Sequence, residues 1–90
     1  MGDIRLISFV ARGKRRKETL SLISEHQRLS QSEIMKKLKQ YKSHNSITLK
    51  ELFEKELIFC INPEERSFKF YKITKKGREV LREIEKISKS

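Results

Sequence analysis

The feature that most constrains the fold is a short helix with a well-defined start and a second helix close behind it. Residues Ser30–Glu33 read Ser-Gln-Ser-Glu, a capping box in which the serine hydroxyl accepts from a first-turn amide and the glutamate reaches back. Ile34 and Leu38 follow four residues apart, on one face of a helix. We expect this short helix to end near Lys39–Tyr41.

A second helix is predicted only a few residues later. It starts near Ser43, a residue type suited to the N-cap position, and closes at Glu56. Its apolar residues are three and four positions apart, which assigns them to the face toward the core: Leu49, Leu52 and Phe53. Two helices separated by so few residues are a candidate helix-turn-helix.

Two segments of strand length follow the paired helices. Leu57–Ile61 is a continuous apolar run, and Ser67–Ile73 is rich in aromatic residues with lysines interleaved. The connection, Asn62–Arg66, contains an Asn-Pro pair, and proline fixes a φ angle that suits a turn. We therefore predict a β-hairpin with a basic, aromatic second arm.

Helical patterns also flank this unit. One spans Lys14–Glu25, and residues 1–12 ahead of it are interpreted as an N-terminal arm. The other begins after Thr74 as its cap and runs from Lys75 to about Ser88, within a C-terminal segment 75–90. The sequence thus predicts a mainly α fold with a small β-hairpin.

The size of the chain limits what it can do. Ninety residues form one domain, 1–90, with a small core and no second lobe to close over a substrate. No nucleophile with a nearby base, carboxylate pair or glycine-rich phosphate loop is found in the sequence, so we expect no enzyme. The single cysteine, Cys60, excludes an internal disulfide and a cysteine zinc site, and we expect it to be an inert core residue.

No cofactor or metal is expected. No apolar run approaches the roughly 20 residues of a membrane helix, and the first residues do not have the pattern of a signal peptide. We expect a cytoplasmic protein without membrane contact.

The charge distribution points to a polyanionic partner. The formal net charge is +10, from 22 lysines and arginines against 12 acids. Seventeen of those 22 basic residues lie in three windows without a single acid: Ile4–Lys17, Ile34–Lys50 and Arg66–Arg78. One such run is usually only a solvated face, but clustering in three windows costs self-repulsion that evenly mixed charges would avoid. Nucleic acid is a partner for which such clusters are useful.

Two motifs resemble those of winged helix-turn-helix regulators of the ArsR/MarR type. Ser46–Ile58 is similar to the S-x-x-L-x-x-L-x-x-x-G-L-I signature of their recognition helix and first wing strand, and Tyr71–Gly77 is similar to the Y-x-L-T-x-K-G that closes the wing. Phe9–Lys17 and Asn62–Glu65 resemble small archaeal members that consist of this domain alone. The resemblance covers nearly the whole chain.

The chain departs from this family in three respects. Glu56 stands where the family has a glycine that ends the recognition helix, so this helix has to stop differently or to be slightly strained. Lys39 stands where the turn of the motif is often glycine. The cysteine-rich metal-sensing box of some ArsR members is missing from the sequence, so we expect no metal response.

The resemblance implies a winged helix-turn-helix with a three-helix core, a β wing and a C-terminal helix that binds double-stranded DNA. The recognition helix would read base edges from the face opposite its apolar residues, through Ser43, His44, Asn45, Ile47 and Thr48. These small polar side chains predict modest sequence discrimination. His44 and Asn45 are equally open to a capping role at the helix start.

The basic windows supply the expected contacts with phosphate. Backbone contacts are predicted around the motif and ahead of the first helix, from Arg12, Lys14, Arg15, Arg16, Lys36, Lys37, Lys42 and Lys50. The wing would place Arg66 and Lys69 against the minor groove or the backbone. A two-stranded wing cannot bury both of its faces. Phe68 and Phe70 lie on one face of the second strand, and Tyr71 lies on the other. One of these two sets is expected to pack against the helices, and the other to meet a partner chain or solvent.

The last helix is open to two interpretations. Its apolar stripe completes a monomer core against the first helix, or it pairs with a copy of itself. We favour a homodimer, because regulators of this kind read two half-sites. The predicted interface residues are Val80, Leu81, Ile84 and Ile87.

Three functions are compatible with these observations. The first is a DNA-binding transcriptional regulator, which we favour. The second is a weakly specific architectural nucleic-acid-binding protein that uses the same basic windows. The third is a protein-interaction winged helix in a transcription assembly, which docks through Phe68, Phe70 and the last helix.

Overall fold

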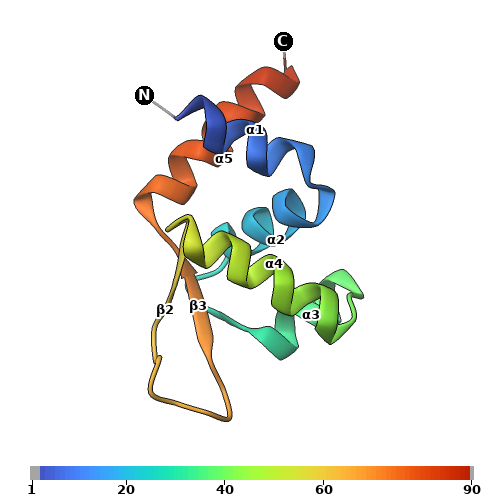
Figure 1. The fold of residues 1–90 in the computed structure, drawn as a ribbon, viewed down its shortest axis with the longest axis vertical. Helices are drawn as coiled ribbons and strands as arrows, with labels where there is room; N and C mark the ends of the chain where they lie inside the picture. Colours follow the sequence, from blue (N-terminus) through green and yellow to red (C-terminus); the bar gives the residue numbers. More distant parts are fainter. Residues whose placement is uncertain (1–2, 90) are drawn as a thin grey trace.

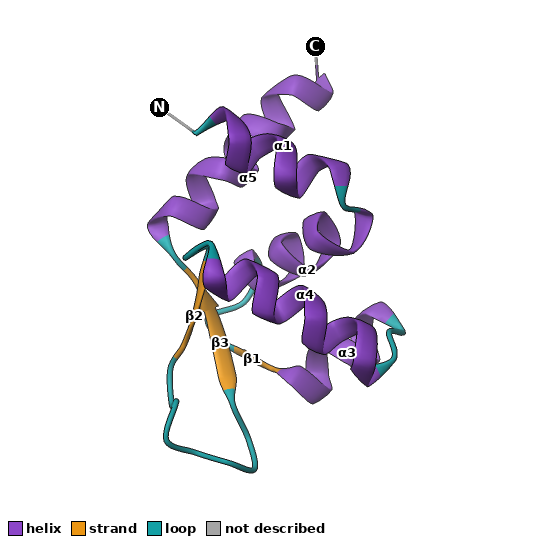
Figure 2. Ribbon diagram, in the orientation of Figure 1, coloured by secondary structure: helices purple, strands orange, loops and turns teal. Residues whose placement is uncertain are grey.

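The computed structural model describes residues 3–89, and the side chains of residues 3–87. Within these residues the helices are α1 (Ile4–Arg12), α2 (Lys14–Ser24), α3 (Gln31–Leu38), α4 (Lys42–Glu54) and α5 (Lys75–Lys89), and the strands are β1 (Leu29–Ser30), β2 (Ile58–Cys60) and β3 (Phe70–Ile73). The two chain ends lie at one end of the molecule and the β2–β3 loop extends from the other (Figure 1). The mainly α fold with a hairpin is confirmed (Figure 2).

The start of α3 confirms the predicted capping box. The Glu33 amide donates to the Ser30 hydroxyl at 3.2 Å, and the Ser30 amide donates to the Glu33 carboxylate at 3.0 Å. The hydrogen bond from the Ser30 amide, with a smaller contribution from the Ser30 side chain, favours the ionised carboxylate and lowers the pKa of Glu33. The helix ends at Lys39, whose φ of 53° lies in the left-handed region. A lysine therefore adopts the conformation for which the family uses glycine.

The start of α4 differs from the prediction. The helix begins at Lys42, with Tyr41 as its N-cap and no side-chain cap hydrogen bond, so the assignment of Ser43 to the N-cap is wrong. Ser43 lies inside the first turn instead.

The end of α4 explains how the helix stops without glycine. Glu56 has a φ of 60°. Its amide donates to Phe53 O at 3.0 Å, and the Leu57 amide donates to Leu52 O at 3.0 Å, the bond pattern of a Schellman motif. The left-handed conformation costs a residue with a Cβ about 1–2 kcal/mol. The buried side chains of Leu52 and Leu57, at the two ends of the motif, offset that cost.

The hairpin is confirmed, although its strands are shorter than predicted. β2 and β3 pair antiparallel, with Phe59 opposite Lys72. The side chain of Asn62 holds the loop, because its Nδ2 donates to Phe68 O at 2.6 Å and its Oδ1 accepts from the Phe70 amide at 2.8 Å. A third strand that the sequence did not indicate, β1, pairs with β3 and gives the sheet order β1-β3-β2.

Residues 4–12, which the sequence analysis assigned to an N-terminal arm, form a helix that it did not predict. α1 buries Leu6 and Val10, which are four residues apart, and it packs against α2 and α5. Asp3 caps the helix by accepting from the Arg5 amide at 2.9 Å. The first two residues of the predicted arm, 1 and 2, lie outside the described residues.

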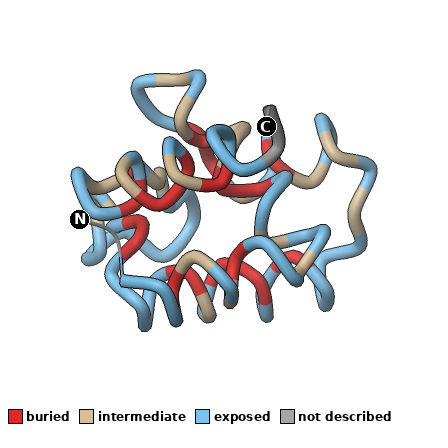
Figure 3. The backbone as a smooth tube through the Cα atoms, turned by 90° about the horizontal axis from the view of Figure 1, so that it is seen from above, coloured by how far each residue is buried: buried red, intermediate tan, exposed pale blue. Residues whose placement is uncertain are grey.

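α5 completes the core of the single chain. Val80, Leu81 and Ile84 are buried together with residues of α1, α2 and β3, and the buried stretches of the backbone face inward (Figure 3). The assignment of these three residues to a dimer interface is therefore wrong. They complete the monomer core, which is the first of the two interpretations of this stripe. The fourth, Ile87, is exposed.

The junction between α4 and α5 is tightly packed. The Thr74 hydroxyl accepts from the Gly77 amide at 3.0 Å, which confirms the predicted cap, and it donates to Glu56 O at 2.7 Å. A Cβ on Gly77 would lie 2.3 Å from Leu57 O, so only glycine fits there. None of the helices in residues 3–89 is both long and apolar enough to cross a membrane.

Candidate nucleic-acid interface

The solvent face of α4 is a stripe of four residues. Ser43, Ser46, Ile47 and Lys50 are exposed, and their spacing of three and four places them on one side of the helix. Ile47 is 59% exposed, which is unusual for an isoleucine and leaves its side chain available to an apolar partner such as a thymine methyl group. We call these four residues the α4 stripe.

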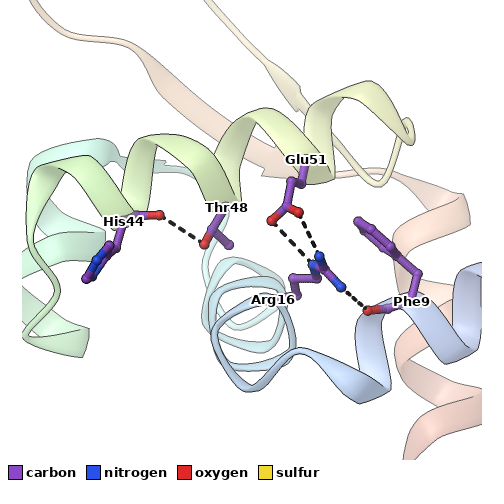
Figure 4. A network of polar contacts seen from close by, with 5 residues as sticks. All are labelled: Phe9, Arg16, His44, Thr48 and Glu51. Carbon is purple, nitrogen blue, oxygen red and sulfur yellow. Dashed lines mark hydrogen bonds and ion pairs between the residues drawn. The ribbon is translucent and has the colours of Figure 1, made fainter.

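Two of the residues predicted to read bases face the core instead. Asn45 is 0% exposed and Thr48 is 3% exposed. Asn45 donates through Nδ2 to Gln40 Oε1 at 2.8 Å, and Thr48 donates through Oγ1 to His44 O at 3.1 Å (Figure 4). The prediction that they point away from the core is wrong, and Phe53, which it placed on the inner face, is exposed.

Helical spacing would have corrected this assignment. Asn45 precedes Leu49 by four residues and Thr48 precedes Leu52 by four, so each lies on the face of a buried leucine. The same spacing places Ser46 on the exposed side of the helix, so Ser46 is a candidate site residue that the sequence analysis missed. Its Oγ accepts from Gln31 Nε2 at 2.9 Å, which brings the first residue of α3 to the α4 stripe.

A basic groove lies beside the α4 stripe. It has a volume of about 650 Å³ and separates the start of α2 from α4. His44 and Ile47 line it from α4, and the ring of His44 contacts that of Tyr41 edge-on, with centroids 6.2 Å apart. The cations on its other walls are Arg12, Lys14, Arg15, Arg16 and Lys39, and the carboxylates of Glu18 and Glu51 line it as well. The structure therefore unites two of the three basic windows.

The wing brings the third window to the same region. A smaller cleft of about 270 Å³ lies between the start of α3 and the β2–β3 loop. Lys42 of α4 and the predicted wing residues Arg66 and Lys69 line it together, and all three are exposed. Lys36 and Lys37, in the last turn of α3, are also exposed.

Arg16 differs from the other predicted phosphate contacts. Its guanidinium donates from Nη2 to Glu51 Oε2 at 2.7 Å and from Nη1 to Phe9 O at 2.9 Å (Figure 4). It also lies over the Phe9 ring, 3.8 Å from the centroid. The neighbouring Arg12, Lys14 and Arg15 are exposed.

Tyr71 of the wing packs against the core, whereas the set of Phe68 and Phe70, expected to share one environment, is divided. Tyr71 is half-buried against the core, and this burial, with a smaller effect of Cys60, raises the pKa of its hydroxyl. Phe68 is exposed, whereas Phe70 is half-buried under Arg28, whose guanidinium carbon lies 4.7 Å from the ring centroid. Cys60 is only half-buried and borders a cavity between α4 and the wing.

The fold is similar to that of several solved structures. Staphylococcus aureus MepR in its DNA complex matches with a TM-score of 0.78 and 21% identity, over 96% of this chain and 73% of that chain. A MarR mutant from E. coli complexed with operator DNA matches with a TM-score of 0.75 and 17% identity, over 91% and 62%. Reduced HlyU from Vibrio cholerae matches with a TM-score of 0.72 and 23% identity, over 94% and 85%.

The extent of these likenesses defines what they show. No protein-family model and no curated protein matches the sequence. The chain spans 58% of the length of an S. aureus MepR mutant to which it is 25% identical, and 55% of FabT from Streptococcus pneumoniae, solved in complex with DNA. Three of the matched structures, those of FabT, the MarR mutant and MepR, are complexes with DNA, and this chain has the winged-helix fold of these proteins.

Proposed function

We propose that this protein is a DNA-binding transcriptional regulator, in which α4 enters the major groove and the wing contacts the backbone or the minor groove. One observation carries the proposal: the α4 stripe lies between the basic groove and the basic wing cleft. A helix that presents small side chains between two cationic flanks matches the shape and charge of a DNA groove.

The residues proposed to meet base edges are revised by the burial of Asn45 and Thr48. The set becomes Gln31, Ser43, His44, Ser46 and Ile47. None of these is an arginine, the residue that makes the commonest specific contact with guanine. We therefore expect modest discrimination between sequences, with much of the affinity supplied by phosphate contacts.

The cations proposed to bind phosphate flank the stripe on both sides. They are the exposed side chains of Arg12, Lys14, Arg15, Lys36, Lys37, Lys42 and Lys50, together with Arg66 and Lys69 of the wing. Because each neutralised phosphate releases counterions, loss of one contact lowers the slope of log affinity against log salt by about 0.9.

A homodimer remains part of the proposal. Regulators that read two half-sites about 34 Å apart are two-fold symmetric. Because Val80, Leu81 and Ile84 belong to the monomer core, the interface would use other surfaces of α1 and α5, where Ile4 and Ile87 are exposed. Light scattering at protein concentrations of about 10 to 50 micromolar would contradict this if it returned a monomer. The resemblance to archaeal single-domain members also stays a prediction.

The second candidate is a weakly specific architectural protein, which the lack of arginine in the α4 stripe favours. The two candidates differ in the ratio of specific to non-specific affinity. A docking role in a transcription assembly is the third, and it would use the exposed Phe68.

Selection from fragmented genomic DNA, followed by fluorescence anisotropy, tests the proposal. The probes are a selected duplex of about 30 base pairs and a scrambled duplex of the same composition, titrated between about 50 and 200 mM KCl. A regulator binds the selected duplex at least about 10³-fold more tightly than the scrambled one. A ratio near one with a steep salt slope supports the architectural protein, and no binding to either duplex contradicts both.

A further inference from the structure

The guanidinium of Arg16 makes three hydrogen bonds within the protein. Nε donates to Glu51 Oε1 at 3.3 Å and Nη2 to Glu51 Oε2 at 2.7 Å, which makes the pair bidentate. Nη1 donates to Phe9 O at 2.9 Å. Both side chains are mostly shielded, with 27% of Arg16 and 30% of Glu51 exposed. A bidentate, partly buried pair of this kind fixes the relative orientation of the two side chains and also contributes stability.

These contacts join three helices. Phe9 lies in α1, Arg16 in α2 and Glu51 in α4. Phe9 O lies in the last turn of α1, where backbone carbonyls lack hydrogen-bond donors within the helix. Arg16 Nη1 supplies the donor for this carbonyl. One turn beyond Glu51, the Lys55 ammonium lies 5.5 Å from the centroid of the Phe9 ring. The C-terminal part of α4 is thus linked to α1 through Arg16 of α2 and through Lys55, the C-cap residue of α4.

Gly13 leaves the space that the Arg16 side chain needs. A Cβ on Gly13 would lie 2.7 Å from Cδ and 3.0 Å from Cγ of Arg16. The backbone φ of −105° at Gly13 suits any residue, so the requirement for glycine here is one of space. Gly13, the residue between α1 and α2, therefore lacks the Cβ that would crowd the Arg16 side chain in this position.

We propose that Arg16, paired with Glu51, is a positioning residue that sets the orientation of α4 for DNA binding and does not itself contact phosphate. The proposal rests on the proposed DNA-binding function. It changes the role of Arg16, a member of the basic window 4–17, from phosphate contact to positioning residue. It also gives the negatively charged Glu51 a role that favours DNA binding. A carboxylate on a DNA-facing helix otherwise repels the phosphates.

The sign of the effect at Glu51 separates the two roles. Removing a negative charge from α4 strengthens DNA binding if only charge matters, and weakens it if Glu51 orients the helix. We expect Glu51→Gln to bind the selected duplex about three- to tenfold more weakly than the wild type. The matched control is Glu54→Gln, an exposed acid on the same helix, which is expected to bind up to about twofold more tightly.

Variants of Arg16 test the same proposal through the salt dependence. Arg16→Lys keeps the charge but cannot form the fork, so positioning predicts weaker binding with an unchanged salt slope. Lys14→Gln serves as the contrast, because loss of a phosphate contact lowers the slope by about 0.9. Full affinity in Arg16→Lys, or a slope lowered in Arg16→Gln as much as in Lys14→Gln, overturns the proposal. So does Glu51→Gln binding that equals or exceeds that of the wild type.

A measurement without DNA keeps this proposal separate from the proposed function. Nitroxide labels at Ala11→Cys and Ser43→Cys, in a Cys60→Ser background, report the distance between α1 and α4 by pulsed electron paramagnetic resonance. Adding Glu51→Gln should broaden the distance distribution while circular dichroism and thermal unfolding show a folded protein. An unchanged distribution overturns the positioning role. If the wild type fails to bind either duplex, the proposed function falls and the distance measurement alone decides the role of Arg16.

Discussion

The two faces of α4 have similar polarity and opposite roles. The inner face places Asn45 and Thr48 beside the fully buried Leu52, whereas the outer face exposes Ile47 and Phe53. A polar residue is therefore no guide to the solvent-exposed side of this helix, and an apolar residue is no guide to its core side. What distinguishes the faces is spacing relative to the residues that pack against α2 and α3.

The largest effect that would test this comparison is expected at Leu52. Leu52→Ala removes a fully buried side chain, and we expect the free energy of unfolding to fall by about 2–5 kcal/mol. Urea unfolding followed by circular dichroism measures the change. Ile47→Ala, on the outer face, is the control, with an expected change within about 0.5 kcal/mol. Equal losses in both variants would mean that the inner and outer faces are wrongly assigned.

Asn45 provides the next largest effect. Asn45→Ala removes the hydrogen bond to Gln40, and we expect a loss of about 1–2 kcal/mol in the free energy of unfolding. The effect is limited because Asn45 Oδ1 already lacks a hydrogen-bond partner among the described residues. Ser46→Ala, one position along, should change stability by less than about 0.5 kcal/mol. An Asn45→Ala protein of unchanged stability with altered preference among duplexes would restore the original assignment.

Lys50 tests the outer face through binding instead of stability. Lys50→Gln should weaken binding to the selected and scrambled duplexes alike, by about three- to fivefold, and lower the salt slope by about 0.9. Arg82→Gln, an exposed cation on α5, is the matched control and should leave the slope unchanged. Fluorescence anisotropy across the salt series gives both quantities. A change confined to the selected duplex would show that Lys50 reads bases.

The smallest effect concerns Glu33, in the helix that supports the α4 stripe. The pKa of Glu33 is lower in the folded protein than its ordinary value. Its contribution to the free energy of unfolding is therefore fully present above about pH 4.3, the unfolded pKa, and is lost as the pH falls through the folded pKa. Glu33→Ala should be less stable than the wild type at neutral pH, by about 0.5–1 kcal/mol for the lost cap. Thermal unfolding at neutral and acidic pH measures this. The difference should shrink in acid, and a constant difference would contradict the role of the ionised carboxylate.

Local signals predicted much of the fold. The capping box at Ser30, the Thr74 cap and the turn around Asn62 were found in the sequence because each depends on residues within a few positions of one another. β1 was missed for the opposite reason. Leu29–Ser30 is a strand only because it pairs with Phe70 and Tyr71, about forty positions away.

The candidate site was predicted in outline and not in detail. The exposed positions of Ser43, His44 and Ile47 agree with the sequence-based assignment, whereas Asn45 and Thr48 do not. Polar and apolar residues occur on both faces of α4, so residue type misplaced Asn45 and Thr48 on the outer face and Phe53 on the inner face. The helix α1 was missed because a basic segment was interpreted by its charge, although its buried pair was present in the sequence.

The sequence by itself determined the charge, the order of helices α2 to α5 with the hairpin between α4 and α5, and the caps at Ser30 and Thr74, because these depend on composition and on neighbours along the chain. Only the tertiary structure decided which cation of the basic windows is neutralised. Arg16 and Glu51 are 35 positions apart, and no local rule relates them. Burial and ion pairing depend on how distant helices pack, and packing is what turned one member of a basic window inward while its neighbours remained exposed.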